Sequence, residues 1–221
     1  MTGDAVDVGC GTGKFAAVLA GHGLRVTGVE PDLRMASLAA RPGVEVQVAT
    51  FEEWTPSSDG YDLFGCAQAW HWLTPGLRGV KARSCLKPGG HLVLAWNLPV
   101  HQDHLDAVVD EVQAEVLLPG WDAPYRAAEQ AHPVDFDLFA EELTDCGFRD
   151  VDQLVLPWRA SFTAQRWARL LGTGSAYLTL APDDRARVVR AVEDRLAYRF
   201  GSQVEVEYAC VLLVARSGGV R

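Results

Sequence analysis

The stretch Asp7-Val8-Gly9-Cys10-Gly11-Thr12-Gly13-Lys14 follows a short apolar run near the start of the chain. An apolar strand that feeds a glycine-rich turn and then a helix is how α/β proteins hold nucleotide-like ligands. Glycines let the backbone turn tightly and approach a ligand, because no Cβ stands in the way. The stretch therefore predicts an α/β fold with a ligand at the carboxyl end of the first strand.

Two phosphate-binding interpretations of this loop fail on spacing. A dinucleotide fingerprint, G-x-G-x-x-G, requires its third glycine where the chain has Lys14. A P-loop, G-x-x-x-x-G-K-[ST], requires a glycine where the chain has Val8 and a hydroxyl residue where it has Phe15. The loop therefore belongs to another class of glycine-rich turn.

The remaining pattern, D-x-G-C-G-T-G, resembles the first motif of class I S-adenosylmethionine (SAM)-dependent methyltransferases. Three further features resemble the same family: the acid Glu30 at the end of segment 25–30, the E-P-x-x-x-M pattern that ends at Met35, and the K-P-G-G turn at 87–90. The resemblance covers residues 5–97. It implies a Rossmann-like, seven-stranded methyltransferase sheet with helices on both faces, an α-helical cap insertion, and SAM as the cofactor.

The resemblance also implies which residues bind SAM. The glycine loop passes under the methionine part of the cofactor, and Glu30 accepts hydrogen bonds from the ribose hydroxyls; its alternative is a solvated carboxylate at a strand end. Thr50 stands where the family often has the acid that binds adenine, so Phe51 is expected to supply an amide and a stacking face, and Glu52 is a candidate for the acid. The expected cofactor-binding residues are Asp7, Gly9, Cys10, Gly11, Gly13, Glu30, Pro31, Met35, Thr50, Phe51 and Gln68.

The fourth expected strand ends in Gln68-Ala69-Trp70-His71-Trp72. The D/N-P-P-Y/F motif of DNA adenine methyltransferases is absent there, whereas an aromatic–His pair resembles the small-molecule group that includes trans-aconitate methyltransferase-like proteins. His71 is the candidate general base, since its ordinary pKa suits neutral pH; the alternative is a His that bonds a backbone carbonyl and shapes the turn. Trp70 and Trp72 are candidates to flank the substrate or the sulfonium, or else to pack in the core.

Length and composition indicate the number of domains and the kinds of partner that the protein can bind. The chain has 221 residues, 48% of them hydrophobic, which fits one domain over 1–221 with a cap and substrate region at about 98–160. A formal charge of −9 argues against binding to nucleic acid. No apolar run is long enough to span a membrane, and five scattered cysteines suggest free thiols in the cytoplasm.

Periodicity predicts alternating strands and helices, hence a largely parallel sheet. The first helix is expected to pack on the sheet through Phe15, Val18 and Leu19, and the last strand to run antiparallel. The expected strands are 5–9, 25–30, 44–49, 61–67, 91–96, 151–158 and 203–215, and the expected helices are 13–22, 32–40, 76–86, 103–118, 137–146, 163–171 and 183–199.

The region after the fifth strand contains His101 and His104 in an H-x-x-H pattern. A metal site would need further ligands, and none is evident, so we expect no metal, a solvated helix start, and both His101 and His104 facing the substrate. Few residues precede the first strand, so the cleft needs a cover from segment 119–136 or from a partner subunit. The apolar face Leu105, Val108, Val112 and Val116 is accordingly a candidate homodimer interface, or else covers its own sheet.

Together these features predict a SAM-dependent methyltransferase that acts on a small molecule by O-, N- or C-methylation. The alternative is a non-catalytic SAM-fold module or partner subunit.

Overall fold

A computed structural model describes residues 3–100, 103–116 and 135–218 of the chain. The described residues form two compact units. Unit 1 consists of residues 3–97, 135–156 and 210–218, and unit 2 of residues 98–100, 103–116 and 157–209. The expected start of the cap region at 98 coincides with a unit boundary. Its expected end does not, because the chain returns to unit 1 at 135 and leaves it again after 156.

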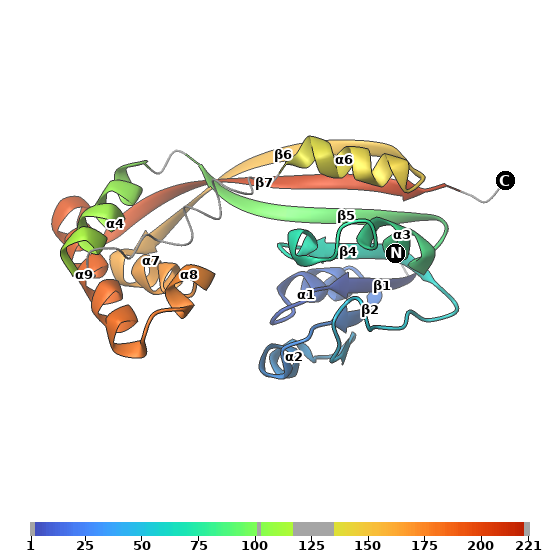
Figure 1. Cartoon of the computed structure of the whole chain (residues 1–221), viewed down its shortest axis with the longest axis horizontal. Coiled ribbons are helices and arrows are strands. Elements are labelled where there is room, and N and C mark those ends of the chain that lie inside the picture. The colour runs from blue at the N-terminus through green and yellow to red at the C-terminus, as the bar shows by residue number, and fades with distance from the viewer. Residues whose placement is uncertain (1–2, 101–102, 117–134, 219–221) are drawn as a thin grey trace. The chain divides into compact units, whose positions relative to one another are not determined.

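Five parallel strands form the centre of unit 1, in the spatial order β3-β2-β1-β4-β5. Figure 1 labels β2, β1, β4 and β5 in this order. The neighbours of β1 are in register with it, since Val6 lies opposite both Thr27 and Phe64. The strand order reverses between β1 and β4, and open α/β sheets bind ligands at the carboxyl ends of the strands at such a point. The strands are β1 (Gly3–Val8), β2 (Leu24–Val29), β3 (Val44–Gln47), β4 (Tyr61–Ala67) and β5 (Leu86–Val100).

The crossover helices follow from this order. Helix α1 (Lys14–Gly21) connects β1 to β2 and helix α2 (Leu33–Ala39) connects β2 to β3, so both crossovers move toward the β3 edge of the sheet. Helix α3 (Arg78–Cys85) connects β4 to β5, and this crossover moves toward the opposite edge. Because such crossovers are right-handed, α3 covers the opposite face of the sheet from α1 and α2. The 3-10 turn η1 (Trp70–Trp72) comes between β4 and α3.

Two long strands complete a seven-stranded sheet of order β3-β2-β1-β4-β5-β7-β6. They are β6 (Phe148–Thr163), preceded by helix α6 (Phe136–Asp145), and β7 (Gln203–Ser217). β5 and β6 pass from unit 1 into unit 2, whereas β7 passes from unit 2 into unit 1. β7 therefore runs antiparallel to its neighbours, and the predicted fold class and antiparallel last strand are confirmed.

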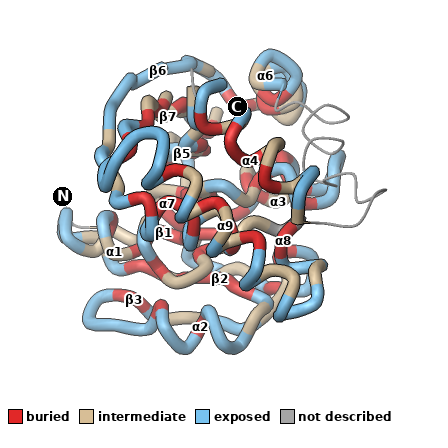
Figure 2. Tube along the Cα trace, turned by 90° about the vertical axis from the view of Figure 1, so that its left-hand side faces the viewer, coloured by how far each residue is buried: buried red, intermediate tan, exposed pale blue. Residues whose placement is uncertain are grey.

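The core of unit 1 lies on both faces of its central strands, which Figure 2 shows as mostly buried, while α2 and β3 carry much exposed surface. Ala5, Val6 and Val8 of β1 are all buried, as expected of a strand with helices on both sides. The prediction for α1 was wrong at one residue: Leu19 is buried, but Val18 is 54% exposed. An eight-residue helix presents only a narrow stripe to the sheet, and Val18 falls outside it.

Unit 2 is built around helices α4 (Asp103–Val116), α7 (Ala164–Leu171), α8 (Ser175–Leu178) and α9 (Pro182–Phe200). Leu105, Val108 and Val112 of α4 are buried in one cluster with Val188 and Leu196 of α9, and Val116 packs against it. The apolar face of α4 is thus covered inside the chain. Its role as a homodimer interface was a wrong prediction, because α7 and α9 fold back over it.

Within the three described ranges, no helix has the length and apolarity needed to cross a bilayer.

The five cysteines all have free thiols.

Candidate functional site: a cavity at the carboxyl edge of the sheet

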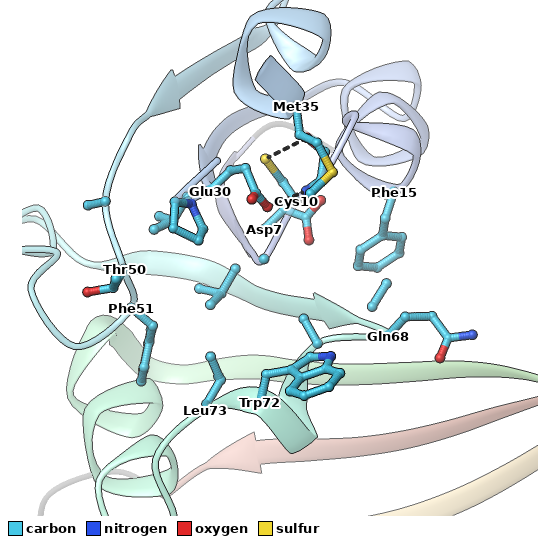
Figure 3. Close-up of a pocket in the computed structure, with 18 of the residues that line it drawn as sticks. Asp7, Cys10, Phe15, Glu30, Met35, Thr50, Phe51, Gln68, Trp72 and Leu73 are labelled. Carbon is cyan, nitrogen blue, oxygen red and sulfur yellow. Dashed lines mark hydrogen bonds between the residues drawn. The ribbon is translucent and has the colours of Figure 1, made fainter. Parts of the chain in front are cut away.

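A cavity of about 690 Å³ opens beyond the carboxyl ends of β1, β2 and β4, entirely within unit 1. Figure 3 shows Thr50 and Phe51 at one end, Phe15 and Gln68 at the other, and Asp7 and Glu30 between them. Eleven of the residues expected from sequence line this cavity: Asp7, Gly9, Cys10, Gly11, Glu30, Pro31, Met35, Thr50, Phe51, Gln68 and Trp72. Gly13, Trp70 and His71 do not line it.

Two glycines of the glycine loop have different roles. Gly11 and Gly13 both have left-handed backbones, with φ of 56° and 78°. A Cβ at Gly11 would meet no atom of the described residues within 4 Å, so this glycine borders open space in the cavity. A Cβ at Gly13 would come within 2.9 Å of the backbone of Ala39 in α2. Gly13 thus permits helix packing at the start of α1, whereas Gly11 leaves room for a ligand.

Glu30 is held at the tip of β2 by the backbone. Its Oε2 accepts a hydrogen bond from the N–H of Gly11 (N to O distance 2.9 Å), and its Oε1 accepts one from the N–H of Asp32 (3.0 Å). The residue is only 5% exposed, yet it lines the cavity. Each carboxylate oxygen has a second lone pair, so Glu30 is oriented to accept two further hydrogen bonds, as a vicinal diol requires.

Asp7 is a buried carboxylate without a partner. It is fully buried at the end of β1, and among the described residues neither of its oxygens has a hydrogen-bond partner. Burial is the main cause that raises the pKa of Asp7 to about 7; the dipole of the Ala16 N–H, which does not form a well-aligned hydrogen bond, opposes this shift, and the charge of Glu30 adds to it. Because an unsatisfied carboxylate beside a cavity is costly, the site favours a ligand with a cationic or hydrogen-donating group.

In the loop after β3, the polar side chains of Thr50 and Glu52 form hydrogen bonds within the protein. The hydroxyl of Thr50 donates to Glu53 (2.9 Å) and accepts from the Glu53 N–H (3.2 Å). Oε1 of Glu52 accepts from both the N–H and the hydroxyl of Thr74, at 3.0 and 2.8 Å. The ring of Phe51 is packed against Trp54 in the core, since the residue is only 3% exposed. The expected stacking face of Phe51 is therefore turned away from the cavity.

Gln68 stands just past β4 in a strained conformation. Its φ of 58° is left-handed, which is uncommon for a residue other than glycine and tends to occur at functional sites. Its side-chain N–H donates to the carbonyl of Asn97 at 3.0 Å, which fixes the amide and leaves Oε1 as an acceptor. The backbone N–H also donates to Ala95 in β5.

The two tryptophans of η1 have opposite surroundings. Trp72 is 73% exposed and lines the cavity. Trp70 is fully buried, packs edge-on against Phe64, and lies under the guanidinium of Arg78. Trp70 is thus a core residue, the alternative that the sequence left open, and the expectation that it contacts substrate does not fit its burial.

His71 is an exposed residue of η1, and the indole nitrogen of Trp96 lies 3.5 Å from Nδ1 of its imidazole. An indole N–H can only donate, so Nδ1 accepts and the neutral ring carries its proton on Nε2. Burial, followed by the charge of Arg78, holds the pKa of His71 below its usual 6.5. In this state the exposed ring nitrogen is a donor. The base role of His71 stays a prediction, and it would require the other tautomer.

Arg78 anchors the turn that carries these residues. Its guanidinium pairs with both carboxylate oxygens of Glu142 in α6, with a shortest N to O distance of 2.6 Å, and donates to the carbonyl of Trp70 at 3.0 Å. It also lies over the ring of Phe139. The geometry of η1 therefore depends on a helix that is distant in sequence.

Sequence reasoning missed Phe15 and Leu73, which also line the cavity. Phe15 was expected only to pack on the sheet. Phe15 does pack on the sheet as expected, because a Cβ at Gly65 of β4 would come within 2.6 Å of its ring. A glycine inside an apolar strand often marks such a close approach.

Two expectations concern other parts of the chain. His101 and most of segment 119–136 lie outside the described residues. In the part of the chain that the structure describes, no cluster of three or more His, Cys, Asp or Glu side chains is arranged to hold a metal ion.

Comparison with known proteins identifies the family of this site. A family model described as a methyltransferase domain matches residues 2–153. The chain belongs to the class I SAM-dependent methyltransferase family. The glycine loop, Glu30 and the cavity all fall within the matched segment.

Individual relatives differ in how much they share. Methyltransferases without assigned activity from Mycobacterium tuberculosis and Mycobacterium bovis are 37% identical over 94 residues, which is 42% of this chain and 39% of theirs. The chain thus matches well under half the length of these mycobacterial relatives. A trans-aconitate 2-methyltransferase from Deinococcus radiodurans is 31% identical over 95% of this chain and 85% of its own.

Among solved structures, a phosphoethanolamine N-methyltransferase from Haemonchus contortus in complex with SAM has a TM-score of 0.58 at 16% identity, over 97% of this chain and 48% of that chain. This similarity supports the fold.

The cavity fits the cofactor of the family on its own chemistry. Asp7 offers an unpaired carboxylate, Glu30 offers two oriented acceptors, and Gly11 leaves the space that a ligand needs.

Proposed function

We propose that this chain transfers a methyl group from SAM to a small-molecule substrate. The observation that carries the proposal is the cavity at the switch point of the sheet, where Asp7 at the end of β1 and backbone-held Glu30 at the end of β2 both lie beside the glycine loop. When bound, SAM supplies a methyl group activated by a sulfonium. The chain then mainly has to bind, align and exclude water.

The residues divide these tasks by position. The loop around Gly11 and the carboxylate of Asp7 hold the amino-acid end of the cofactor, Glu30 holds the ribose, and the loop from Thr50 to Glu52 borders the purine. Gln68 and Trp72 stand at the substrate side. The fixed Oε1 of Gln68 accepts a hydrogen bond from a substrate N–H or O–H.

A non-catalytic SAM-fold module is not favoured by these features. The glycine loop is intact, Glu30 is oriented by two backbone N–H groups, and the exposed Trp72 lines the cavity together with Gln68. We further propose that the protein acts in the cytoplasm and binds neither nucleic acid nor membrane, in keeping with its formal charge of −9.

Glu30→Ala tests the cofactor site. It should weaken binding of S-adenosylhomocysteine, measured by calorimetry, by about 2–3 kcal/mol, the cost of losing charge-assisted hydrogen bonds to two hydroxyls. The 2′,3′-dideoxy analogue should lose little. The matched control is Glu45→Ala on the exposed side of β3, which should bind like wild type. Equal losses for both ligands would mean that Glu30 only supports the loop.

Activity is tested by transfer of radiolabelled methyl from SAM. Trans-aconitate is the first substrate to try, because one relative carries that activity in its name. Tight binding of S-adenosylhomocysteine with no transfer to a panel of small amines, alcohols and carboxylates would instead support the non-catalytic module.

A further inference from the structure

Lys81 of α3 makes an unusually complete set of contacts with the loop that borders the cavity. Its ammonium donates to the carbonyl oxygens of Phe51 (2.6 Å), Glu52 (2.9 Å) and Trp54 (2.6 Å). A lysine ammonium has three N–H donors, so all three are used on this one loop. The loop is therefore fixed to α3 by its backbone.

Aromatic packing reinforces the same contact. The ammonium lies 5.0 Å from the centre of the Phe51 ring and 5.9 Å from that of Trp54. Both rings are buried, and they pack against each other and against Phe64 and Tyr61 of β4. A cation between carbonyl oxygens and aromatic faces is stabilised from two sides. The loop position is thus set jointly by α3 and β4.

A second set of hydrogen bonds connects the loop to Thr74, which follows η1. Glu52 receives two hydrogen bonds from Thr74, which follows Leu73, a residue of the cavity wall. These bonds are the main cause that keeps the pKa of Glu52 below its ordinary value. Thr50 is committed to Glu53. The side chains of Thr50 and Glu52 are therefore engaged in hydrogen bonds that fix the loop, and a ligand would contact the backbone of the loop.

We propose that Lys81 is a positioning residue that fixes the Thr50–Trp54 loop in the shape that distinguishes the purine of the cofactor. This inference rests on the proposed function, because it assigns the Thr50 end of the cavity to the purine. It assigns Lys81 no contact with the cofactor. Loss of Lys81 frees three carbonyl groups, so the loop loses the fixed edge against which a 6-amino purine is recognised.

The test compares two ligands that differ only at the purine edge, S-adenosylhomocysteine and S-inosylhomocysteine, by calorimetry. Wild type should prefer the adenine compound by tenfold or more. Lys81→Met should lower affinity for S-adenosylhomocysteine about tenfold, leave that for S-inosylhomocysteine nearly unchanged, and so remove the preference. Lys87→Met is the matched control, because Lys87 pairs with Asp62 outside the cavity wall, and it should keep the preference.

The outcomes separate the two proposals. If wild type binds neither compound, the proposed function fails. If wild type binds and Lys81→Met keeps its preference, or loses affinity for both compounds equally, the positioning role is overturned. Should Lys81→Met fail to fold, Thr74→Val loosens the same loop from its exposed side. It should lower affinity about threefold for the adenine compound only, and an equal loss for both compounds overturns the role.

Discussion

Single residues differ most from their sequence expectations where burial changes their chemistry. Asp7 was expected as one member of a cofactor motif, but the structure shows a carboxylate that is fully buried and has no hydrogen-bond partner among the described residues. Such a group is costly in the ligand-free protein, because its desolvation is not repaid. The fold thus gives up some stability at the place where the proposed ligand binds.

This cost predicts a pH dependence for Asp7. Its pKa is about 7 in the folded chain and near 3.8 when unfolded, so between these values only the folded state keeps the proton. The ligand-free protein should therefore lose stability relative to Asp7→Asn as pH rises from about 4 to about 7, with no further change above. Urea unfolding measures this difference. Parallel profiles would contradict it, and Asp59→Asn at an exposed turn should run parallel to wild type.

Two histidines should hold opposite tautomers. Nδ1 of His71 faces an indole N–H and must accept, whereas Nδ1 of His22 lies 2.8 Å from the carbonyl of Val18 and must donate. Nitrogen NMR should find the proton of neutral His71 on Nε2 and that of His22 on Nδ1. The His71 titration should also lie below pH 6.5, because burial and Arg78 disfavour its charge. A His71 proton on Nδ1 would support the general-base prediction.

At the scale of elements, three segments far apart in sequence meet at one ion pair. Arg78 begins α3, Glu142 lies in α6, and the Trp70 carbonyl belongs to η1. The side chains of Arg78 and Glu142 are only 7% and 17% exposed. Removing one partner of such a pair is costly because the other charge stays buried. Periodicity predicted α3 and α6 but gave no sign of this link.

Arg78→Met should therefore destabilise the protein by about 3–5 kcal/mol in urea unfolding. Adding Glu142→Leu should regain much of the loss, since no buried charge remains. Arg25→Met is the matched control, because its pair with Asp4 is exposed, and it should change stability by less than about 1 kcal/mol. A loss at Arg78 as small as that at Arg25 would show that the pair does not hold η1 in place.

At the scale of the whole molecule, the chain forms two compact units, each with its own core. All the described residues that line the cavity belong to unit 1. Helix α4 shows why the sequence was ambiguous: an apolar stripe has the same spacing whether it packs on another subunit or on the same chain. The structure places this stripe inside unit 2.

Val108→Asp should accordingly unfold unit 2 and not alter an interface. A carboxylate at this fully buried position should raise hydrogen exchange across α4, α7 and α9 while unit 1 keeps its exchange pattern. Ala107→Asp, on the exposed side of the same helix, should have little effect. A folded Val108→Asp variant that turns a wild-type dimer into a monomer by light scattering would instead show that the face is an interface.

The sequence by itself determined the local features: the strands and helices, the glycine loop, the acid at the tip of β2 and the family they indicate. These follow from periodicity and from backbone conformations that only certain residues adopt, and both are properties of neighbouring positions. Eleven of the expected site residues duly line one cavity.

Only the tertiary structure decided the roles that depend on distant partners. Trp70 is buried while Trp72 is exposed, Gly13 meets Ala39 while Gly11 borders open space, and Lys81 holds a loop that precedes it by some thirty positions. The boundary of unit 2 and the partner of the α4 stripe are of the same kind. Burial, pKa and hydrogen-bond satisfaction are set by which segments pack together, and the spacing of residues along the chain does not contain that information.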